Sequence, residues 1–185
     1  MNGATNGSQV IPTATCSPSA LAQGSPYGGL FDYRENTVNT CNLEGWHVRT
    51  TGAIVPGQGF IGRVPVGTTI DLSGTFVTGQ TVTGPALTKT ANASGRPAGM
   101  NLVANPFAAP IDWQAVAAAN SSSVMGTAYF YQTSGPLAGT YVPVNTTTGG
   151  GEIGTSQSFF VEAATNGVTV VFDNSMKRTG SNNYL

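Results

Sequence analysis

Few residues of this 185-residue sequence could carry out chemistry. The one histidine, His47, lies in the strand-like run Trp46-His47-Val48, and no Gly-x-Ser-x-Gly turn occurs in the chain. Nucleophilic catalysis by a Ser-His-Asp triad needs a histidine base beside a serine held on an exposed turn of that kind. We therefore predict no triad and interpret His47 as an outward-facing residue of a strand.

Carboxylates are the next candidates, because glycoside hydrolysis needs two of them across a sugar ring. None of the eight Asp and Glu residues lies in a recognisable active-site motif. We therefore predict no catalytic residue and a protein that is not an enzyme. Neither a D-x-D-x-D-G calcium loop nor a zinc-type ligand spacing occurs. We expect no cofactor, while one structural calcium ion held by backbone carbonyls and single aspartates stays open. The carboxylates are Asp32, Glu35, Glu44, Asp71, Asp112, Glu152, Glu162 and Asp173.

Aromatic rings are better candidates for recognition, because exposed rings stack on sugars while neighbouring amides and carboxylates hold the hydroxyl groups. We select Tyr27, Tyr129 and Tyr131 as candidate ligand-binding residues. They come from a wider set of Tyr27, Phe31, Tyr33, Trp46, Tyr129, Tyr131 and Tyr141. The phenylalanines that we expect in the core are Phe31, Phe60, Phe130, Phe159 and Phe172.

The two cysteines, Cys16 and Cys41, suffice for one disulfide bond. It would close a loop of about 25 residues and stabilise the fold by roughly 3 kcal/mol in the chain-entropy model. Such a bond requires an oxidising compartment. Two free, partly buried thiols are the alternative.

Composition indicates a neutral, β-rich extracellular protein. Charged residues make up only 8% of the chain and the net charge is -1, so no basic cluster could neutralise a nucleic acid backbone. Abundant Thr, Val, Asn and Gly favour strands and tight turns. No run approaches twenty apolar residues, so we expect no membrane span. The start Met1-Asn2-Gly3-Ala4 does not resemble a signal peptide, and we expect an excised mature fragment with an added Met.

The sequence carries an internal repeat with an offset of 99 residues. Residues 54–61 are echoed by 153–160, with Gln58 matching Gln157 and Phe60 matching Phe159. The echo continues upstream, where 30–33 matches 129–131 and 45–48 matches 139–142, and downstream, where 67–72 matches 167–172. Apolar and turn positions are kept, and within the central runs 54–61 and 153–160 one glutamine is the shared polar residue. This pattern predicts a duplicated fold unit and no duplicated catalytic site.

Short runs of β-forming residues alternate with Gly, Pro and Asn signals, which is typical of a sandwich. Asp112 is a suitable N-cap for a helix over 113–120, with Asn120 at its exit. Thr165-Asn166-Gly167 is a hairpin signal, so we expect the strands on either side of it to pair. The predicted strands are 30–33, 45–49, 59–64, 68–72, 75–83, 100–104, 126–132, 139–144, 157–163 and 168–172.

These elements predict an all-β, jelly-roll-like β-sandwich built from two related halves, with one short helix near 112–120. We expect an extended lead-in or edge strand over 1–26, a first β half over 27–99 and a second β half over 100–185. The two halves could share a single core.

The central motif resembles a known bacterial signature. The run from Leu102 to Phe107, followed by Ile111-Asp112-Trp113, is similar to the LVGNPYPSPIDW signature of large secreted and surface proteins of Bacteroidota. Such modules commonly precede a type IX secretion sorting domain. The flanks at 45–46, 57–61, 69–74 and 172–184 also match, so the likeness covers about 27–185. The chain departs from the pattern at Ala104 and at Ala108-Ala109, and it ends without a Lys-rich sorting tail.

The resemblance implies a secreted β module that is attached to other domains of a larger surface protein. Our first hypothesis is a non-catalytic structural or adhesive module of a bacterial cell-surface protein, located outside the cell. The alternative is a carbohydrate-binding module of a secreted polysaccharide-degrading enzyme. A third hypothesis is self-association through the outermost strands, because residues 168–172 are apolar and β-prone. We expect polysaccharide or a second copy as partners, and no nucleic acid.

Overall fold

The computed structural model describes residues 29–35, 45–48, 54–63, 77, 79–90, 97–147 and 151–178. The chain divides into two compact units. The first comprises Met1–Ala53 and Phe60–Thr75, and the second comprises Ile54–Gly59 and Phe76–Leu185. Every sheet is antiparallel and the described residues hold one short α-helix, so the predicted all-β class is confirmed. The jelly-roll connectivity and the division after residue 99 stay predictions.

The first unit contains a three-stranded sheet. Strands β1 (Gly29–Tyr33), β2 (Trp46–Val48) and β3 (Ile61–Arg63) lie in the order β2-β1-β3. Tyr33 pairs with Trp46 across β1 and β2, and Phe31 pairs with Ile61 across β1 and β3. These strands agree with the predicted runs 30–33, 45–49 and 59–64.

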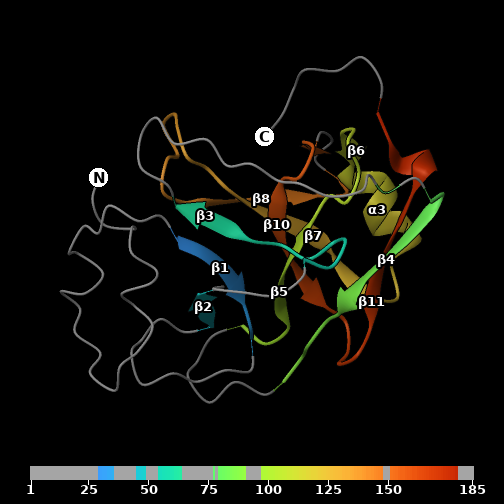
Figure 1. Cartoon of the computed structure of the whole chain (residues 1–185), viewed down its shortest axis with the longest axis horizontal. Helices are drawn as coiled ribbons and strands as arrows, with labels where there is room; N and C mark the ends of the chain where they lie inside the picture. The colour runs from blue at the N-terminus through green and yellow to red at the C-terminus, as the bar shows by residue number, and fades with distance from the viewer. Residues whose placement is uncertain are drawn as a thin grey trace. The chain divides into compact units, whose positions relative to one another are not determined.

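The second unit packs a four-stranded sheet against a second layer (Figure 1). The sheet has the order β5-β10-β7-β8, and the other layer contains the β4–β11 pair, the β6–β9 pair and the helix α3. The strands of the sheet are β5 (Met100–Ala104), β10 (Ser158–Ala163), β7 (Val124–Tyr131) and β8 (Tyr141–Asn145). The other elements are β4 (Thr81–Ala86), β11 (Thr169–Asp173), β6 (Ile111–Asp112), β9 (Glu152–Ile153), α3 (Trp113–Ala119) and the 3-10 turn η2 (Asn174–Met176).

Alternate residues of each strand form the core between these two layers. On β10 the inward residues are Phe159, Val161 and Ala163, and each is at most 1% exposed. The Phe159 ring packs 5.6 Å from Phe130 and 5.7 Å from Trp113, measured between centroids. The core positions predicted for Phe130, Phe159 and Phe172 are confirmed. Phe31 and Phe60, for which a core position was also predicted, are only half-buried.

The predicted helix is present. The Asp112 carboxylate accepts a hydrogen bond of 2.9 Å from the Gln114 N–H, as an N-cap does. Trp113, Val116 and Ala117 form the buried face at the expected spacing, and Asn120 is the C-cap. Local signals sufficed here because caps and helical periodicity act within a few residues.

The predicted pairing of the last two strands is wrong. Gly167 has a φ of +84°, as a turn glycine would, but β10 pairs with β5 and β7 while β11 pairs with β4. Gly167 N–H donates to Leu87 O, and Leu87 N–H donates to Val168 O. The turn therefore carries the chain from one layer to the other. Both strands can then place apolar side chains in one core from opposite sides.

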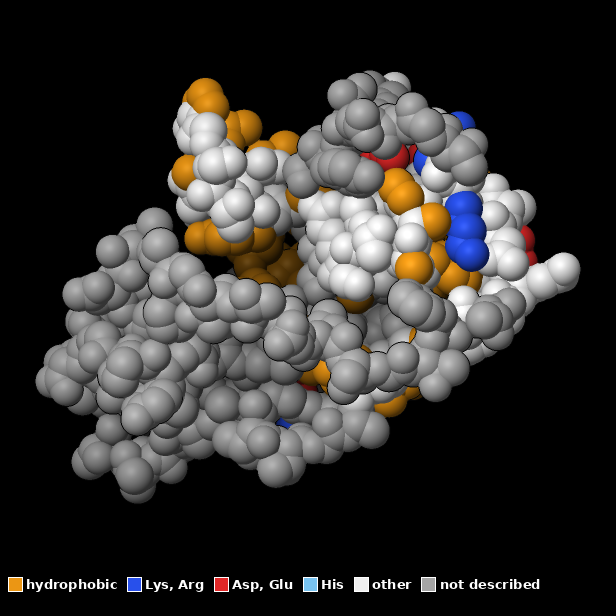
Figure 2. Space-filling view, turned by 45° about the horizontal axis from the view of Figure 1, so that its top comes forward, with side chains coloured by type: hydrophobic (Ala, Val, Ile, Leu, Met, Phe, Trp, Pro, Cys, Tyr) orange, Lys and Arg blue, Asp and Glu red, His pale blue; other side chains and the backbone are white. Residues whose placement is uncertain are grey.

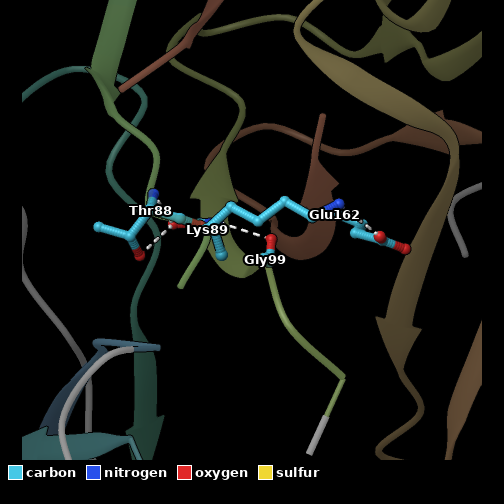
Figure 3. A network of polar contacts seen from close by, with 5 residues as sticks. Thr88, Lys89, Gly99 and Glu162 are labelled. Carbon is cyan, nitrogen blue, oxygen red and sulfur yellow. Dashed lines mark hydrogen bonds and ion pairs between the residues drawn. The ribbon is translucent and has the colours of Figure 1, made fainter. Parts of the chain in front are cut away.

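A polar cluster fastens the segment after β4 to the four-stranded sheet (Figure 3). The Asn101 side-chain oxygen accepts from Thr88 N–H at 2.9 Å, and its amide donates to Thr88 O and Gly99 O at 2.8 and 2.7 Å. Lys89 extends toward Glu162 on β10 with an N–O distance of 3.1 Å. The connection between the layers is thus held by backbone-directed bonds and one partly exposed ion pair.

The internal repeat is visible in two equivalent turns. Val55 N–H donates to the Gln58 side-chain oxygen at 3.4 Å, and Gly154 N–H donates to that of Gln157 at 2.7 Å. The backbone N–H of each glutamine donates to the carbonyl of the residue three positions earlier, at 3.0 Å for Gln58 and 3.1 Å for Gln157. The residue before each glutamine has a positive φ, +81° at Gly57 and +59° at Ser156. The shared glutamine is therefore a turn residue in both copies, a role that the sequence analysis did not assign to it.

Both turns lead into segments that flank strand β5. Val103 bridges to Gln58 on one side and pairs with Phe159 on the other. Gly59 N–H donates to Leu102 O, and Ala104 N–H donates to Gly57 O. A Cβ on Gly59 would lie 2.7 Å from Val103 O, so this approach requires glycine. One strand is thus held by both copies of the repeat.

Candidate functional site

Two of the three predicted ligand-binding tyrosines lie together on β7. Tyr129 and Tyr131 are two residues apart in the strand and therefore project from the same face of the sheet. Tyr131 is 45% exposed, whereas Tyr129 is half-buried. Tyr27 lies outside the described residues. Tyr131 is therefore the candidate that a large ligand can reach.

Tyr131 forms a ring pair with Tyr141 on β8. The two residues are direct cross-strand partners, their ring centroids are 5.2 Å apart and their planes are inclined by 56°. Tyr141 is 42% exposed, and its ring also contacts Phe160 at 5.4 Å. Three cross-strand pairs define what we call the outer β7–β8 face: Tyr131 with Tyr141, Tyr129 with Pro143, and Thr127 with Asn145.

The first unit carries an equivalent ring pair. Tyr33 and Trp46 are cross-strand partners on β1 and β2, with centroids 5.3 Å apart. The sheet order β2-β1-β3 corresponds to β8-β7-β10. The last hydrogen bond before the hairpin loop is also equivalent, because Arg34 N–H donates to Gly45 O and Gln132 N–H donates to Thr140 O. The duplication therefore kept an aromatic pair at one register position, in addition to packing and turns. The sequence echo missed this, because the ring types differ and the hairpin loops have unequal lengths.

The outer β7–β8 face belongs to a long uncharged part of the chain. From Trp113 to Gly151 the sequence contains no Asp, Glu, Lys, Arg or His. In Figure 2 the described surface is mostly uncharged, with few blue or red side chains. Four of the six exposed large hydrophobic residues that the structure describes lie in this stretch: Met125, Tyr131, Leu137 and Tyr141.

Pro143 lies in β8, the outermost strand of the four-stranded sheet among the residues that the structure describes. On this strand the even-numbered residues bond toward β7, because Gln132 N–H donates to Thr140 O and Thr146 N–H donates to Gly126 O. The backbone of Pro143 therefore faces away from β7. Proline has no N–H to offer there, so an added strand would lack a donor at the middle of this edge.

Two asparagines of the central segment use their amides internally. Asn105, which belongs to the signature motif, is 3% exposed and donates to Ala109 O, Ile153 O and Gly154 O, while its oxygen accepts from Phe107 N–H at 2.9 Å. The signature residue thus holds the loop after β5 against the second repeat turn. It presents no group to a ligand.

Asn120 is also 3% exposed, and it covers the edge of β11. Its oxygen accepts from Val171 N–H and its amide donates to Val171 O, both at 2.8 Å. The side chain supplies the two bonds that a neighbouring strand would make there. The apolar strand that we considered for self-association therefore has its outer backbone groups occupied at this position.

The charged side chains of the described residues are mostly used in structural contacts. The Arg178 guanidinium pairs with Asp112, the helix cap. Hydrogen bonds from the Ser175 backbone and hydroxyl and from the Thr81 hydroxyl hold the pKa of the Asp173 carboxyl below its usual value. No group of three or more His, Cys, Asp or Glu side chains that could hold a metal occurs in the described part of the chain.

Cys16 and Cys41 lie outside the described residues, so the disulfide stays a prediction. Within the described ranges, no helix is long and apolar enough to cross a membrane.

The fold and the site define an all-β module with an exposed, uncharged aromatic face. A family model matches residues 10–185, and the chain belongs to that family, which is described as Domain of unknown function (DUF8693). Neither the curated proteins nor the solved structures contain a match.

Proposed function

We propose that the protein is a non-catalytic, secreted structural or adhesive module of a bacterial cell-surface protein. One observation carries this proposal: the polar residues kept by the repeat and by the signature serve to fix the backbone. Gln58 and Gln157 close equivalent turns beside β5, and Asn105 joins the β5 loop to the second of these turns. A fold retained for its rigidity, whose described residues bring no reactive groups together, suits a spacer or an adhesive domain.

The resemblance to secreted surface modules of Bacteroidota supports an extracellular location, and so does the small charged fraction. The same resemblance supports attachment to other domains of a larger protein and export by type IX secretion. Self-association through strand edges is the least favoured hypothesis, because Asn120 occupies the β11 edge and Pro143 interrupts the β8 edge.

A carbohydrate-binding module of a secreted polysaccharide-degrading enzyme is the second candidate. The observation that favours it is the exposed ring pair of Tyr131 and Tyr141. The two candidates differ in the parent protein, because only the second requires a catalytic domain on the same chain.

The proposal is tested in cells that produce the parent protein. We expect antibodies against this chain to label intact cells, and labelling only after lysis would contradict a surface location. Deleting residues 10–185 from the parent should weaken cell attachment and leave any hydrolytic activity of the purified parent unchanged. If the deletion instead removed that activity on a soluble small substrate, the module would belong to the catalytic machinery and the proposal would fail.

A further inference from the structure

The outer β7–β8 face combines three properties that together select a class of ligand. It carries two exposed tyrosine rings in contact, it contains no charge, and it lies at a sheet edge that an added strand cannot pair with fully. Charged ligands gain nothing from such a surface. A peptide that binds by strand addition would lack a donor partner at Pro143.

Neutral sugars fit these properties. A tyrosine ring covers the apolar face of a sugar ring, while the hydroxyl groups of the sugar need uncharged donors and acceptors beside it. The face offers the phenol groups of Tyr131 and Tyr141 at one end and the Thr127 hydroxyl group at the other, where the Asn145 side-chain oxygen already accepts from the Thr147 N–H and hydroxyl at 2.9 and 2.6 Å. The length of β7 from Thr127 to Tyr131 is about 14 Å at ~3.4 Å per residue, so several sugar units of a polysaccharide could lie along the strand.

The repeat adds an independent reason. Most side-chain identities differ between the two copies, yet a cross-strand ring pair persists in both, at 5.3 and 5.2 Å. Cross-strand aromatic pairs stabilise hairpins by only about 0.2–1 kcal/mol, and less when both rings face solvent. Tyr33 and Trp46 are half-buried, whereas Tyr131 and Tyr141 are 45% and 42% exposed, so the β7–β8 copy of the pair is the one whose rings a ligand can reach.

We infer that the outer β7–β8 face binds a neutral polysaccharide, with Tyr131 and Tyr141 as the stacking residues. This rests on the adhesive form of the proposed function and names its partner. Acidic polysaccharides are expected to bind no better than neutral ones, because the face offers no cation to a carboxylate or sulfate group.

Affinity electrophoresis of the whole chain in gels that contain xylan, mixed-linkage β-glucan or galactomannan tests the inference, with alginate as the acidic comparison. We expect retardation by at least one neutral polymer. Tyr131→Ala and Tyr141→Ala should each weaken binding about tenfold, which is the loss of one stacking contact. Tyr131→Phe should stay within about threefold, and Ile54→Ala, which removes an exposed side chain elsewhere in the second unit, should have no effect.

A second measurement needs no variant. Nitration of tyrosines by tetranitromethane, mapped by mass spectrometry, should be slowed at Tyr131 by the retarding polymer and unchanged by alginate. The inference is overturned if no neutral polymer retards the wild-type chain, if alginate retards it more strongly, or if Tyr131 nitrates equally with and without polymer. The first of these results would leave the structural role standing, because cell labelling and the deletion test that role separately.

Discussion

At the scale of single residues, buried amides hold this fold together where strand ladders end. Asn120 satisfies both backbone groups of Val171 and also donates to Val116 O at 2.8 Å. The sequence indicated Asn120 as a helix exit, which is a local role, and the structure confirms it. Its bonds to β11 could not be predicted, because the partner lies 51 residues further along the chain.

Replacing Asn120 by Ala should lower the free energy of unfolding by about 2–4 kcal/mol, because two backbone groups of Val171 would lose their partner in a buried site. Urea denaturation followed by circular dichroism measures this. The control is Ser121→Ala, an exposed neighbour that should stay within ~0.5 kcal/mol of the wild type. An Asn120→Ala protein as stable as that control would show that water or a shift of the strand replaces the amide.

At the scale of elements, periodicity and caps predicted the helix and most of the described strands, but not the strand register or the pairing partners. The two-residue strands β6 and β9 were not predicted, β4 covers Thr81–Ala86 where 75–83 was predicted, and the predicted strand 68–72 lies outside the described residues. The Thr165-Asn166-Gly167 turn shows why, since a turn signal fixes a change of direction and leaves the pairing to the core. Tyr129 and Tyr131 could be selected from the sequence as neighbours on one face. Tyr141 could be singled out only once the β7–β8 register placed it opposite Tyr131.

The edge strand β8 gives a prediction at this scale. Pro143→Thr restores an N–H at an outward backbone position and adds a residue that favours strands. We expect the variant to associate through this edge as its concentration rises, while the wild type associates less at equal concentration. Multi-angle light scattering across a concentration series measures the mass. Pro136→Thr, in the exposed loop between β7 and β8, is the matched control, and equal masses for the two variants would refute a protective role of Pro143.

At the scale of the whole molecule, the small charged fraction should make both stability and binding insensitive to salt. Three ion pairs join described residues: Asp32–Arg34, Lys89–Glu162 and Asp112–Arg178. The arginine of two pairs is more than half exposed, and both side chains of Lys89–Glu162 are about one-third exposed. Pairs of this kind contribute about 0–1 kcal/mol each. Raising NaCl from about 0.1 M to about 1 M shortens the screening length from ~10 to ~3 Å.

We therefore expect the free energy of unfolding to change by less than about 1 kcal/mol over that range, measured by urea denaturation at each salt concentration. Retardation by the neutral polysaccharide should also be unchanged, because stacking on Tyr131 and Tyr141 involves no counterion release. Alginate binding to a basic control protein in the same gels should weaken sharply, which verifies that the salt is effective. A loss of the chain's own retardation at high salt would show that charges outside the outer β7–β8 face make the contact, and the stacking geometry would then not be its cause.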